Sequence, residues 1–213
     1  NSGIGPMTLA DPTGFPCKIA GEVRGFDPQN YIDGKEARRM ARFTQLGVAA
    51  ALRAAASAGL DESNIVLEES GVVLGNGNGG MPTTEEQARV LFERGGMKES
   101  PFFIPMVLPN MAAAQISRTL RLKGYTNTVI TACAAGTQAI GEGAEVIRRG
   151  ASKVVFAGGT EAGICQLSLG GFSVIKALST SNDDPQKASR PFEANRDGFV
   201  PGEGAALLVL EEM

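Results

Sequence analysis

Apolar residues follow two different periods along this chain, and the change from one period to the other predicts strands joined by helices. Short β-branched or continuous apolar runs, typical of buried strands, lie at 71–75, 128–131, 153–157 and 205–210. Apolar residues at helical spacing predict helices at 35–58, 109–122 and after Cys133. A short helix capped by Thr83 or Thr84 is also expected at 83–94. Because strands and helices alternate, we expect an α/β fold with a mostly parallel sheet, in which the strand at 153–157 lies beside the strand at 128–131.

Three stretches depart from these patterns. Gly, Pro and Asp dominate residues 1–33, which we expect to be irregular. Proline recurs through residues 100–109, so we predict no regular helix there. Residues 179–204 are polar, and four of their charged side chains alternate in sign: Arg190, Glu193, Arg196 and Asp197. Two interpretations remain open for this last stretch, a loop ordered by internal ion pairs and a solvated loop whose charges hold nothing.

Composition narrows the class of protein. The chain has 213 residues, of which 43% are hydrophobic, enough to bury a core, and we expect one compact α/β unit. Its net charge of −3 gives no general attraction to nucleic acid or anionic lipid, so neither is expected as a partner. No apolar run is long enough to cross a membrane and the first residues do not resemble a signal peptide, so we expect a cytoplasmic protein.

Cysteine and histidine usage limits the chemistry. Cys17, Cys133 and Cys165 are widely spaced and odd in number, which indicates reduced thiols rather than a disulfide framework or a metal site. The chain has no histidine, the commonest general base and an important metal ligand. The glycine run at 75–80 lacks the Lys and Ser/Thr of a phosphate-binding loop, so nucleotide binding is not expected. We therefore expect neither a metal ion nor a cofactor.

Cys133 lies where a strand pattern changes into a helix pattern. A thiol at the start of a helix faces unpaired backbone N–H groups and the positive end of the helix dipole, which favour the thiolate. Small residues surround it, in the sequence T-A-C-A-A-G, and these leave room for a substrate beside the sulfur. Cys133 is thus a candidate nucleophile. The alternative is a buried cysteine in a tight strand-to-helix packing, because free cysteine is often buried.

Several sequence blocks together resemble one enzyme family. T-A-C-A-A-G-T-Q-A-I, K-V-V-F-A-G-G-T-E-A, A-L-S-T-S and R-P-F-E-A-N-R-D-G-F-V-P-G-E-G-A occur in this order, and the chain resembles the β-ketoacyl-acyl carrier protein synthases, the elongating type II members best. The resemblance implies a thiolase-like layered α/β fold built from two similar halves. Residues 1–213 would be the N-terminal half, without its first strand and without the C-terminal half, so we expect the natural chain to continue past Met213.

The resemblance also implies roles for particular residues. Cys133 would be the nucleophile, and its backbone N–H an oxyanion donor. Three residues match positions around the acyl pocket: Asn78, where an apolar residue is usual, Phe103, which reaches toward a partner's pocket, and Phe172, a gate beside the cysteine. Core packing is the simpler interpretation of Phe103. Four basic residues match positions that dock the acidic carrier protein: Lys35, Arg38, Arg39 and Lys176. The alternative for the first three is an ordinary solvated helix face.

The family's reaction needs groups that this chain lacks. An acyl group passes from a carrier thioester to the cysteine and is then joined to a carbanion formed by decarboxylating a malonyl thioester, with two imidazoles stabilising the enolate. With no histidine, the chain alone is expected to be inactive in condensation and to act only with its other half. Acyl carrier protein is the expected partner, and a homodimer through the nucleophile strand is the expected assembly. Two alternatives are a non-catalytic partner similar to a chain-length factor and a polyketide-type ketosynthase.

Overall fold

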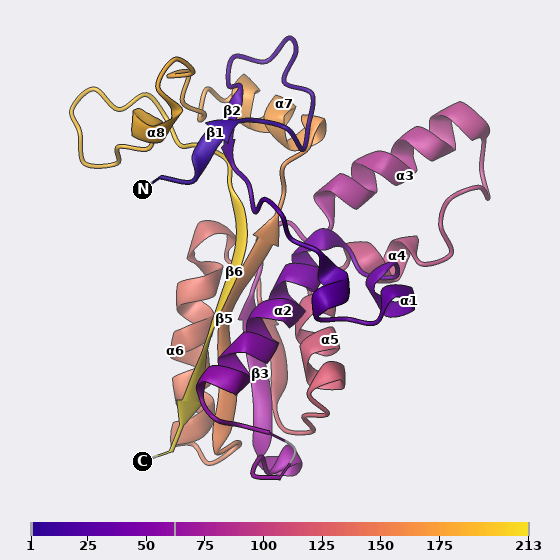
Figure 1. Cartoon of the computed structure of the whole chain (residues 1–213), viewed down its shortest axis with the longest axis vertical. Coiled ribbons are helices and arrows are strands. Elements are labelled where there is room, and N and C mark those ends of the chain that lie inside the picture. The colour runs from indigo at the N-terminus through magenta and orange to yellow at the C-terminus, as the bar shows by residue number, and fades with distance from the viewer. Residues whose placement is uncertain (1, 62, 213) are drawn as a thin grey trace. The chain divides into compact units, whose positions relative to one another are not determined.

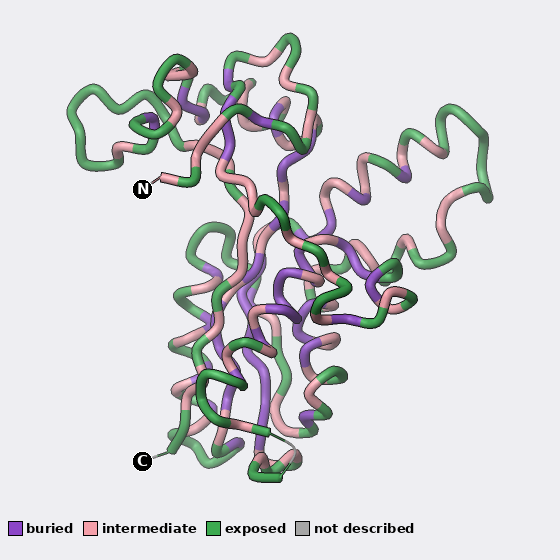
Figure 2. The backbone as a smooth tube through the Cα atoms, in the orientation of Figure 1, coloured by how far each residue is buried: buried purple, intermediate pink, exposed green. Residues whose placement is uncertain are grey.

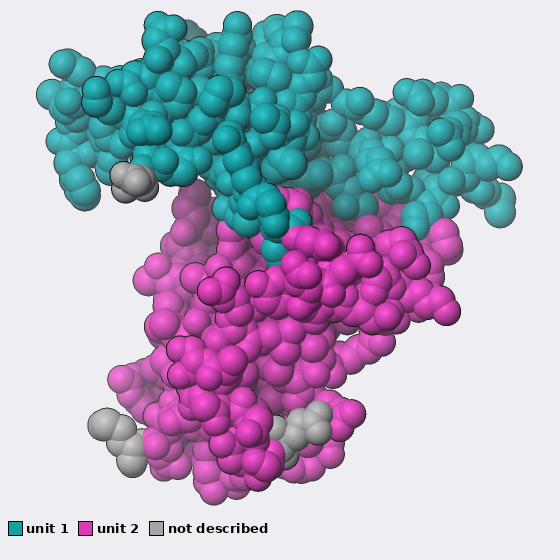
Figure 3. All heavy atoms as spheres, in the orientation of Figure 1, with its two compact units in different colours: residues 1–26, 81–100, 162–203 teal, residues 27–80, 101–161, 204–213 magenta. Residues whose placement is uncertain are grey.

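The computed structural model describes residues 2–61 and 63–212, so Asn1 and Met213 of the expected half lie outside it. The chain divides into two compact units, which Figure 3 shows in two colours. Unit 1 comprises residues 1–26, 81–100 and 162–203, and unit 2 comprises 27–80, 101–161 and 204–213. The expectation of one compact unit is therefore wrong. Residues 1–26, 81–100 and 162–203, which are separate in the sequence, form a second unit with its own core.

Unit 2 is built on a four-stranded sheet in the order β4-β3-β5-β6. Its strands are β3 (Ser70–Gly75), β4 (Thr126–Val129), β5 (Val154–Ala162) and β6 (Glu203–Glu211). β4 and β5 both run parallel to β3, and Figure 1 shows β6 running the opposite way. The α/β fold with a mostly parallel sheet is confirmed. The expected neighbour relation is wrong, because β3 lies between β4 and β5.

Helices cover both faces of this sheet. α6 (Ala135–Arg148) packs on one face, and α2 (Arg42–Ser57) and α5 (Met111–Thr119) lie on the other (Figure 1). Alternate strand residues divide between the faces, as a period of two requires. The α6 side forms one apolar cluster, composed of Val73, Val129, Ala139, Val146, Val155 and Ala157. Figure 2 shows that β3, at the centre of the sheet, is buried along its whole length.

The strand before Cys133 is less buried than expected. β4 is an edge strand, and its first two residues, Thr126 and Asn127, are exposed while Val129 is buried. Ile130 and Thr131, predicted to belong to the strand, follow its end, and Ile130 is 55% exposed. A β-branched run favours a strand but does not say how many neighbours the strand has, so the prediction of burial is wrong.

The long helix predicted over 35–58 is interrupted. α1 (Gly34–Ala37) begins at Asp33, whose carboxylate accepts hydrogen bonds from two backbone N–H groups, and a turn separates it from α2. Ala41 is extended, with φ −67° and ψ 158°, and the Gln45 amide donates to the Ala37 carbonyl at 2.9 Å across the break. Buried Met40 and Ala41 keep the apolar spacing through the turn, which is why the periodicity did not reveal it.

The proline-rich segment does form one short helix, contrary to expectation. α4 (Phe103–Val107) contains Pro105 as its third residue. A proline in the first turn removes an N–H that has no partner within the helix, so it is tolerated there. α3 (Met81–Arg94) begins before the predicted cap at Thr83 or Thr84, which therefore lie inside its first turn.

Unit 1 has its own small core. The two short strands β1 (Ile4–Pro6) and β2 (Ile19–Gly21) pair antiparallel, so residues 1–33 are less irregular than expected. Two helices, α7 (Gln166–Val174) and α8 (Pro185–Ala188), complete the unit with α3. Its core includes Cys17, Ile19, Ile164, Leu169 and Leu178. The remaining short elements of the chain are the 3-10 turns η1 (Pro28–Asn30), η2 (Leu67–Glu69) and η3 (Ala132–Ala134).

The charged loop of unit 1 is ordered by internal contacts. The Asp197 carboxylate accepts hydrogen bonds from the Ser179 hydroxyl at 2.8 Å and the Thr180 N–H at 2.8 Å, and it pairs with Arg190 at 3.1 Å. Arg190 also pairs with Glu193 at 3.1 Å. The interpretation as a loop ordered by internal ion pairs is confirmed. The Ser179 hydroxyl and then the Thr180 N–H lower the pKa of Asp197 to about 2.

We predict that Asp197→Asn lowers the free energy of unfolding by about 1–2 kcal/mol at pH 7, through loss of charge-assisted hydrogen bonds. A carboxyl whose pKa falls on folding stabilises the fold above its unfolded pKa of about 4 and loses this contribution as pH falls toward its folded pKa. The difference between variant and wild type should therefore be constant above about pH 5 and shrink below about pH 4. Urea unfolding at several pH values measures it. Asp183→Asn, in the same loop and exposed, is the control; equal effects of both variants would contradict the prediction.

Among residues 2–61 and 63–212, no helix combines the length and the apolar character needed to cross a membrane.

Candidate active site

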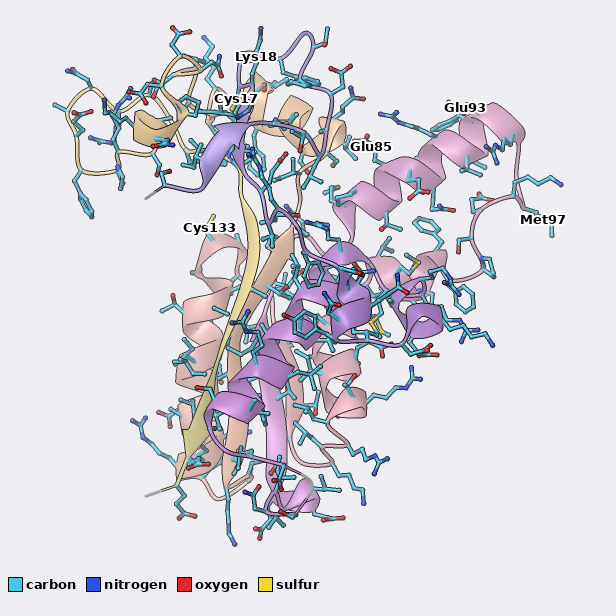
Figure 4. The ribbon with its side chains drawn as sticks, viewed as in Figure 1. Cys17, Lys18, Glu85, Glu93, Met97 and Cys133 are labelled. Atoms are coloured by element: carbon cyan, nitrogen blue, oxygen red, sulfur yellow. The ribbon has the colours of Figure 1, made fainter. Side chains whose placement is uncertain are left out.

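Cys133 lies on a tight turn between β4 and α6. Within unit 2, the chain leaves β4 at Val129, forms the 3-10 turn η3 around Cys133 and enters α6 at Ala135. Cys133 is exposed, and Figure 4 places it at the end of α6 where the helix begins. The interpretation as a buried structural cysteine is therefore wrong for this residue. The predicted position is right within two residues, because a 3-10 turn separates the thiol from the first residue of the α-helix.

The backbone at this turn is suited to bind a developing negative charge. Among the described residues, no side chain caps the start of α6. Ala132, just before Cys133, has a positive φ of 51°, which is unfavourable for any residue with a Cβ. Residues held in such conformations are often found at functional sites. The turn thus presents the sulfur outward. The Ala134 N–H donates to the Thr131 carbonyl at 3.2 Å and the Ala135 N–H donates to the Ala132 carbonyl, so the Cys133 N–H is the candidate oxyanion donor.

The turn is positioned by close backbone packing. A Cβ added to Gly75, at the end of β3, would lie 2.2 Å from the carbonyl carbon of Ala135, and one added to Gly159 would lie 3.0 Å from the Cα of Gly136. Only glycine at these two positions, one at the end of β3 and one within β5, allows the first turn of α6 to lie this close to the sheet. Gly75 and Gly159 are therefore structural parts of the site that sequence reasoning did not assign. The glycines at or just after the ends of the predicted strands 71–75 and 153–157 were the available signal.

A glycine-rich loop lies beside the nucleophile turn. It spans residues 76–80 and follows β3, and a Cβ on Gly77 would lie 3.9 Å from the Cα of Ala132. Asn78, predicted to border the acyl pocket, lies on this loop and is exposed. Phe103, at the start of α4, is half-buried, and the other end of α4 contacts the same loop through a hydrogen bond from the Gly80 N–H to the Val107 carbonyl. Cys133, Asn78 and Phe103 thus all belong to unit 2.

The predicted gate and one docking residue belong to unit 1. The ring of Phe172 is half-buried on α7 and packs edge-on against Phe199, with ring centroids 5.1 Å apart. Lys176, just after α7, is exposed and has a positive φ of 55°. Their roles remain predictions.

The other predicted docking residues form an exposed basic cluster. Lys35, Arg38 and Arg39 are all exposed on α1 and the turn after it. Arg39 contacts Glu36 at 3.4 Å and lies over the Phe102 ring, 4.7 Å from its centroid. Arg118 of α5 joins the cluster by pairing with Glu36 at 2.7 Å. The sequence did not indicate Arg118, because it is distant in the chain. The cluster carries more basic than acidic groups and suits an acidic partner.

The remaining cysteines differ from Cys133. Cys17 and Cys165 are buried in unit 1, as expected for packed thiols, and burial raises the pKa of each. The sulfur of Cys165 lies 3.4 Å from the Ser168 hydroxyl. Among the residues that the structure describes, no group of three or more Cys, Asp or Glu side chains is placed to hold a metal ion.

Comparison with known proteins places this geometry in context. The model of the β-ketoacyl synthase N-terminal domain matches residues 1–213. Two curated proteins named 3-oxoacyl-[acyl-carrier-protein] synthase 2, from Synechocystis and Staphylococcus aureus, are each 44% identical over 212 residues. All of this chain is matched in each, but it spans only 51% of their length.

Solved structures agree with this match. A β-ketoacyl synthase from Burkholderia phymatum is 31% identical with a TM-score of 0.87, over 100% of this chain and 52% of its own. The ishigamide ketosynthase/chain length factor is 31% identical with a TM-score of 0.89, over 99% of this chain and 51% of its own. A type II polyketide synthase acyl-carrier protein in complex with its ketosynthase is 27% identical with a TM-score of 0.73, over 91% of this chain and 52% of its own. The predicted thiolase-like fold is thereby confirmed for this half.

Proposed function

The chain belongs to the β-ketoacyl synthase family, through that family's N-terminal domain, and from this premise we propose that the intact protein is a 3-oxoacyl-acyl carrier protein synthase of fatty acid elongation. The observation that carries the proposal is the exposed Cys133 on a strained turn at an uncapped helix start. The names of the 44% identical relatives support it. Polyketide extension is a second candidate, supported by solved ketosynthases at lower identity, 31% and 27%.

Two bond-forming steps make up the proposed reaction. In the first, the Cys133 thiolate attacks the carbonyl carbon of the acyl thioester, and the carrier's sulfur leaves with the electron pair of the broken bond. The backbone N–H of Cys133 stabilises the oxyanion. In the second, a malonyl thioester loses carbon dioxide, and the electron pair left behind attacks the acyl carbon and expels the Cys133 sulfur.

The two steps place different demands on this chain. Its residues supply the nucleophile and one oxyanion donor, the Cys133 N–H, for the first step. The second step requires groups that stabilise an enolate, and the chain has no histidine to do so. We assign that role to the half of the relatives' length that this chain does not span. Retention of Cys133 favours an enzyme over a non-catalytic chain-length factor.

Intact-mass spectrometry of the protein after incubation with an acyl-carrier thioester tests the loading step. We expect a mass increase equal to one acyl group, and peptide mapping should locate it on Cys133 and not on the buried Cys17 or Cys165. Subsequent addition of malonyl-carrier thioester should remove the adduct and yield a 3-oxoacyl product. An unmodified protein, or an acyl group on another residue, would contradict the proposal.

Carrier docking is the next part of the proposal. We assign it to the basic cluster of Lys35, Arg38 and Arg39, with Lys176 as a further contact, and the acidic charge of carrier proteins in this family supports the assignment. Reversing two exposed charges with Lys35→Glu and Arg38→Glu should raise KM for the carrier-borne donor about tenfold and leave kcat nearly unchanged. The difference should shrink at high salt because exposed charges are screened.

Arg53→Glu is the control for that variant. Arg53 is exposed on α2, outside the basic cluster. Its reversal changes the charge as much as Lys35→Glu or Arg38→Glu alone, so it is compared with each of these single variants. An equal rise of KM in the control would mean that overall charge, and not this cluster, governs the encounter. An acyl donor without a carrier protein should show no difference between any of the variants.

A homodimer and a cytoplasmic location complete the proposal. The outer edge of β4 is open, since the only described strand that pairs with β4 is β3, and such an edge can pair with a second copy. Sedimentation equilibrium of the intact protein tests this, and a monomer would contradict it. The unpaired cysteines suit a reducing compartment, which cell fractionation would test.

A further inference from the structure

The loop beside Cys133, residues 76–80, is held by two side chains that the proposed reaction does not use. The first is Asn76, which is 2% exposed. Its amide donates to the Thr160 carbonyl at 2.6 Å, and its oxygen accepts from the Gly79 N–H at 2.6 Å. The second is Glu161 of β5, whose Oε2 accepts from the Gly77 N–H at 2.9 Å and from the Asn78 N–H at 3.1 Å. Each end of the loop thus has its own anchor.

Glycine makes these anchors necessary. Positions 77, 79 and 80 have no Cβ to restrict the backbone, so the loop has many accessible conformations unless hydrogen bonds select one. Gly79, with φ 65°, is held by Asn76. The Gly77–Asn78 end contacts the nucleophile turn, and its two N–H groups share one acceptor oxygen on Glu161. Loss of that oxygen would release the end of the loop nearest Cys133 while the Asn76 anchor remains.

The loop lies close to the turn. A Cβ on Gly77 would lie 2.9 Å from the Glu161 carboxylate oxygen and 3.9 Å from the Cα of Ala132. Gly77 therefore lies near both the carboxylate and the residue that precedes the nucleophile. In the proposed acyl-enzyme the thioester would start one residue after Ala132, so a displaced loop would change the space next to it.

We propose that Glu161 is a positioning residue that fixes the Gly77–Asn78 backbone beside Cys133 and thereby sets the rate and the chain-length preference of acyl loading. This inference rests on the proposed function, since it concerns acyl transfer to Cys133. Glu161 acts through the loop, because it holds two backbone N–H groups there. The same carboxylate accepts from the backbone N–H of Asn78, whose side chain is exposed on the loop.

Rates of Cys133 acylation in the intact protein test the inference. The donors are butyryl and dodecanoyl thioesters of acyl carrier protein, and the measurement is time-resolved intact mass. Glu161→Ala should lower the first-order loading rate about tenfold, because a displacement of about 1 Å near the reacting atoms can cost this much or more. It should also change the ratio of the two rates. Glu161→Gln keeps an acceptor oxygen at the same distance along the side chain and should stay within about threefold of wild type for both donors.

A glycine variant tests the same contact from the other side. The Cβ of Gly77→Ala would meet the end of the flexible Glu161 side chain, which can move aside, so the variant should fold. It should nevertheless displace the carboxylate and change the ratio of loading rates in the same direction as Glu161→Ala. Glu68→Gln is the matched control, because Glu68 is exposed before the amino end of β3 and pairs only at the surface with Lys123. Its rates should equal those of wild type.

The outcomes separate the inference from the proposed function. If wild type acquires no acyl group on Cys133, both are overturned. If wild type is acylated but Glu161→Ala and Gly77→Ala load both donors at wild-type rates, only the inference is overturned. A thermal midpoint measured for each variant shows whether it is folded. If Glu161→Ala is unfolded, the inference is tested with Gly77→Ala and Glu161→Gln instead. A wild-type ratio of the two loading rates in Gly77→Ala would then overturn the inference.

Discussion

Replacing Cys133 with alanine should lower the rate of acyl transfer by about a thousandfold or more, because removal of the nucleophile of a covalent mechanism leaves only binding and oxyanion stabilisation. The loss should appear as absence of the acyl adduct on the intact protein. Overall stability should change little, since the side chain is exposed and alanine is tolerated in a short turn. The measurement combines intact mass with a thermal midpoint.

Two variants serve as controls. Cys165→Ala and Cys17→Ala remove thiols that are buried, and burial raises their pKa, so neither is expected to react with a thioester. Both should still acquire one acyl group on Cys133, at the cost of a small cavity in the core of unit 1. An acyl adduct that persists in Cys133→Ala and is absent from Cys165→Ala would show that Cys165 of unit 1, and not Cys133, is the nucleophile.

Local patterns in the sequence predicted the elements of unit 2 well. The change of period at Cys133 located a strand, a turn and a helix within two residues, because each of these depends on near neighbours in the chain. The burial of β3 and the apolar face of α6 were predictable for the same reason, because each depends on the spacing of apolar residues within one element. The sequence did not reveal the break in the helix at 38–41, because Met40 and Ala41 are buried there. The apolar spacing therefore continues through the break although the backbone is not helical at Ala41.

Long-range relations could not be predicted in the same way. The insertion of β3 between β4 and β5 depends on which strands pair, and hydrophobic period carries no information on that. The anchoring of the glycine loop by Glu161 joins residues 84 positions apart, and the chain shows only a strand that ends in T-E-A. Family resemblance identified Asn78 on the loop but not the carboxylate that holds it. The structure was needed to connect the two.

The site also explains why glycine occurs at three positions in β3, β5 and α6. Gly75, Gly136 and Gly159 meet where α6 lies on β3 and β5, and their missing side chains bring the helix start close to the sheet. The close packing of these glycines determines how far Cys133 lies from the sheet. Fold stability and the position of the nucleophile therefore depend on the same few atoms, and one substitution should affect both.

Gly75→Ala should lower the free energy of unfolding by about 3 kcal/mol or more, because overpacking against groups that cannot rotate away forces the backbone to shift. The new Cβ would lie 2.2 Å from the carbonyl carbon of Ala135 and 2.4 Å from the nitrogen of Gly136. Both are backbone atoms of the first turn of α6. The shift should displace Cys133 and slow acyl loading even at temperatures where the variant is folded. Urea unfolding and the loading rate measure the two effects.

A graded series makes this prediction specific. A Cβ on Gly159 meets its nearest backbone atom at 3.0 Å, so Gly159→Ala requires a smaller shift and should cost less than Gly75→Ala. A Cβ on Gly96 meets nothing within 4 Å, so Gly96→Ala should change stability by no more than about 0.5 kcal/mol. Equal stability of all three variants would mean that α6 can move away from the sheet without cost. The close packing would then not be what holds Cys133 in place, and the position of the nucleophile would have to depend on the loop at 76–80 instead.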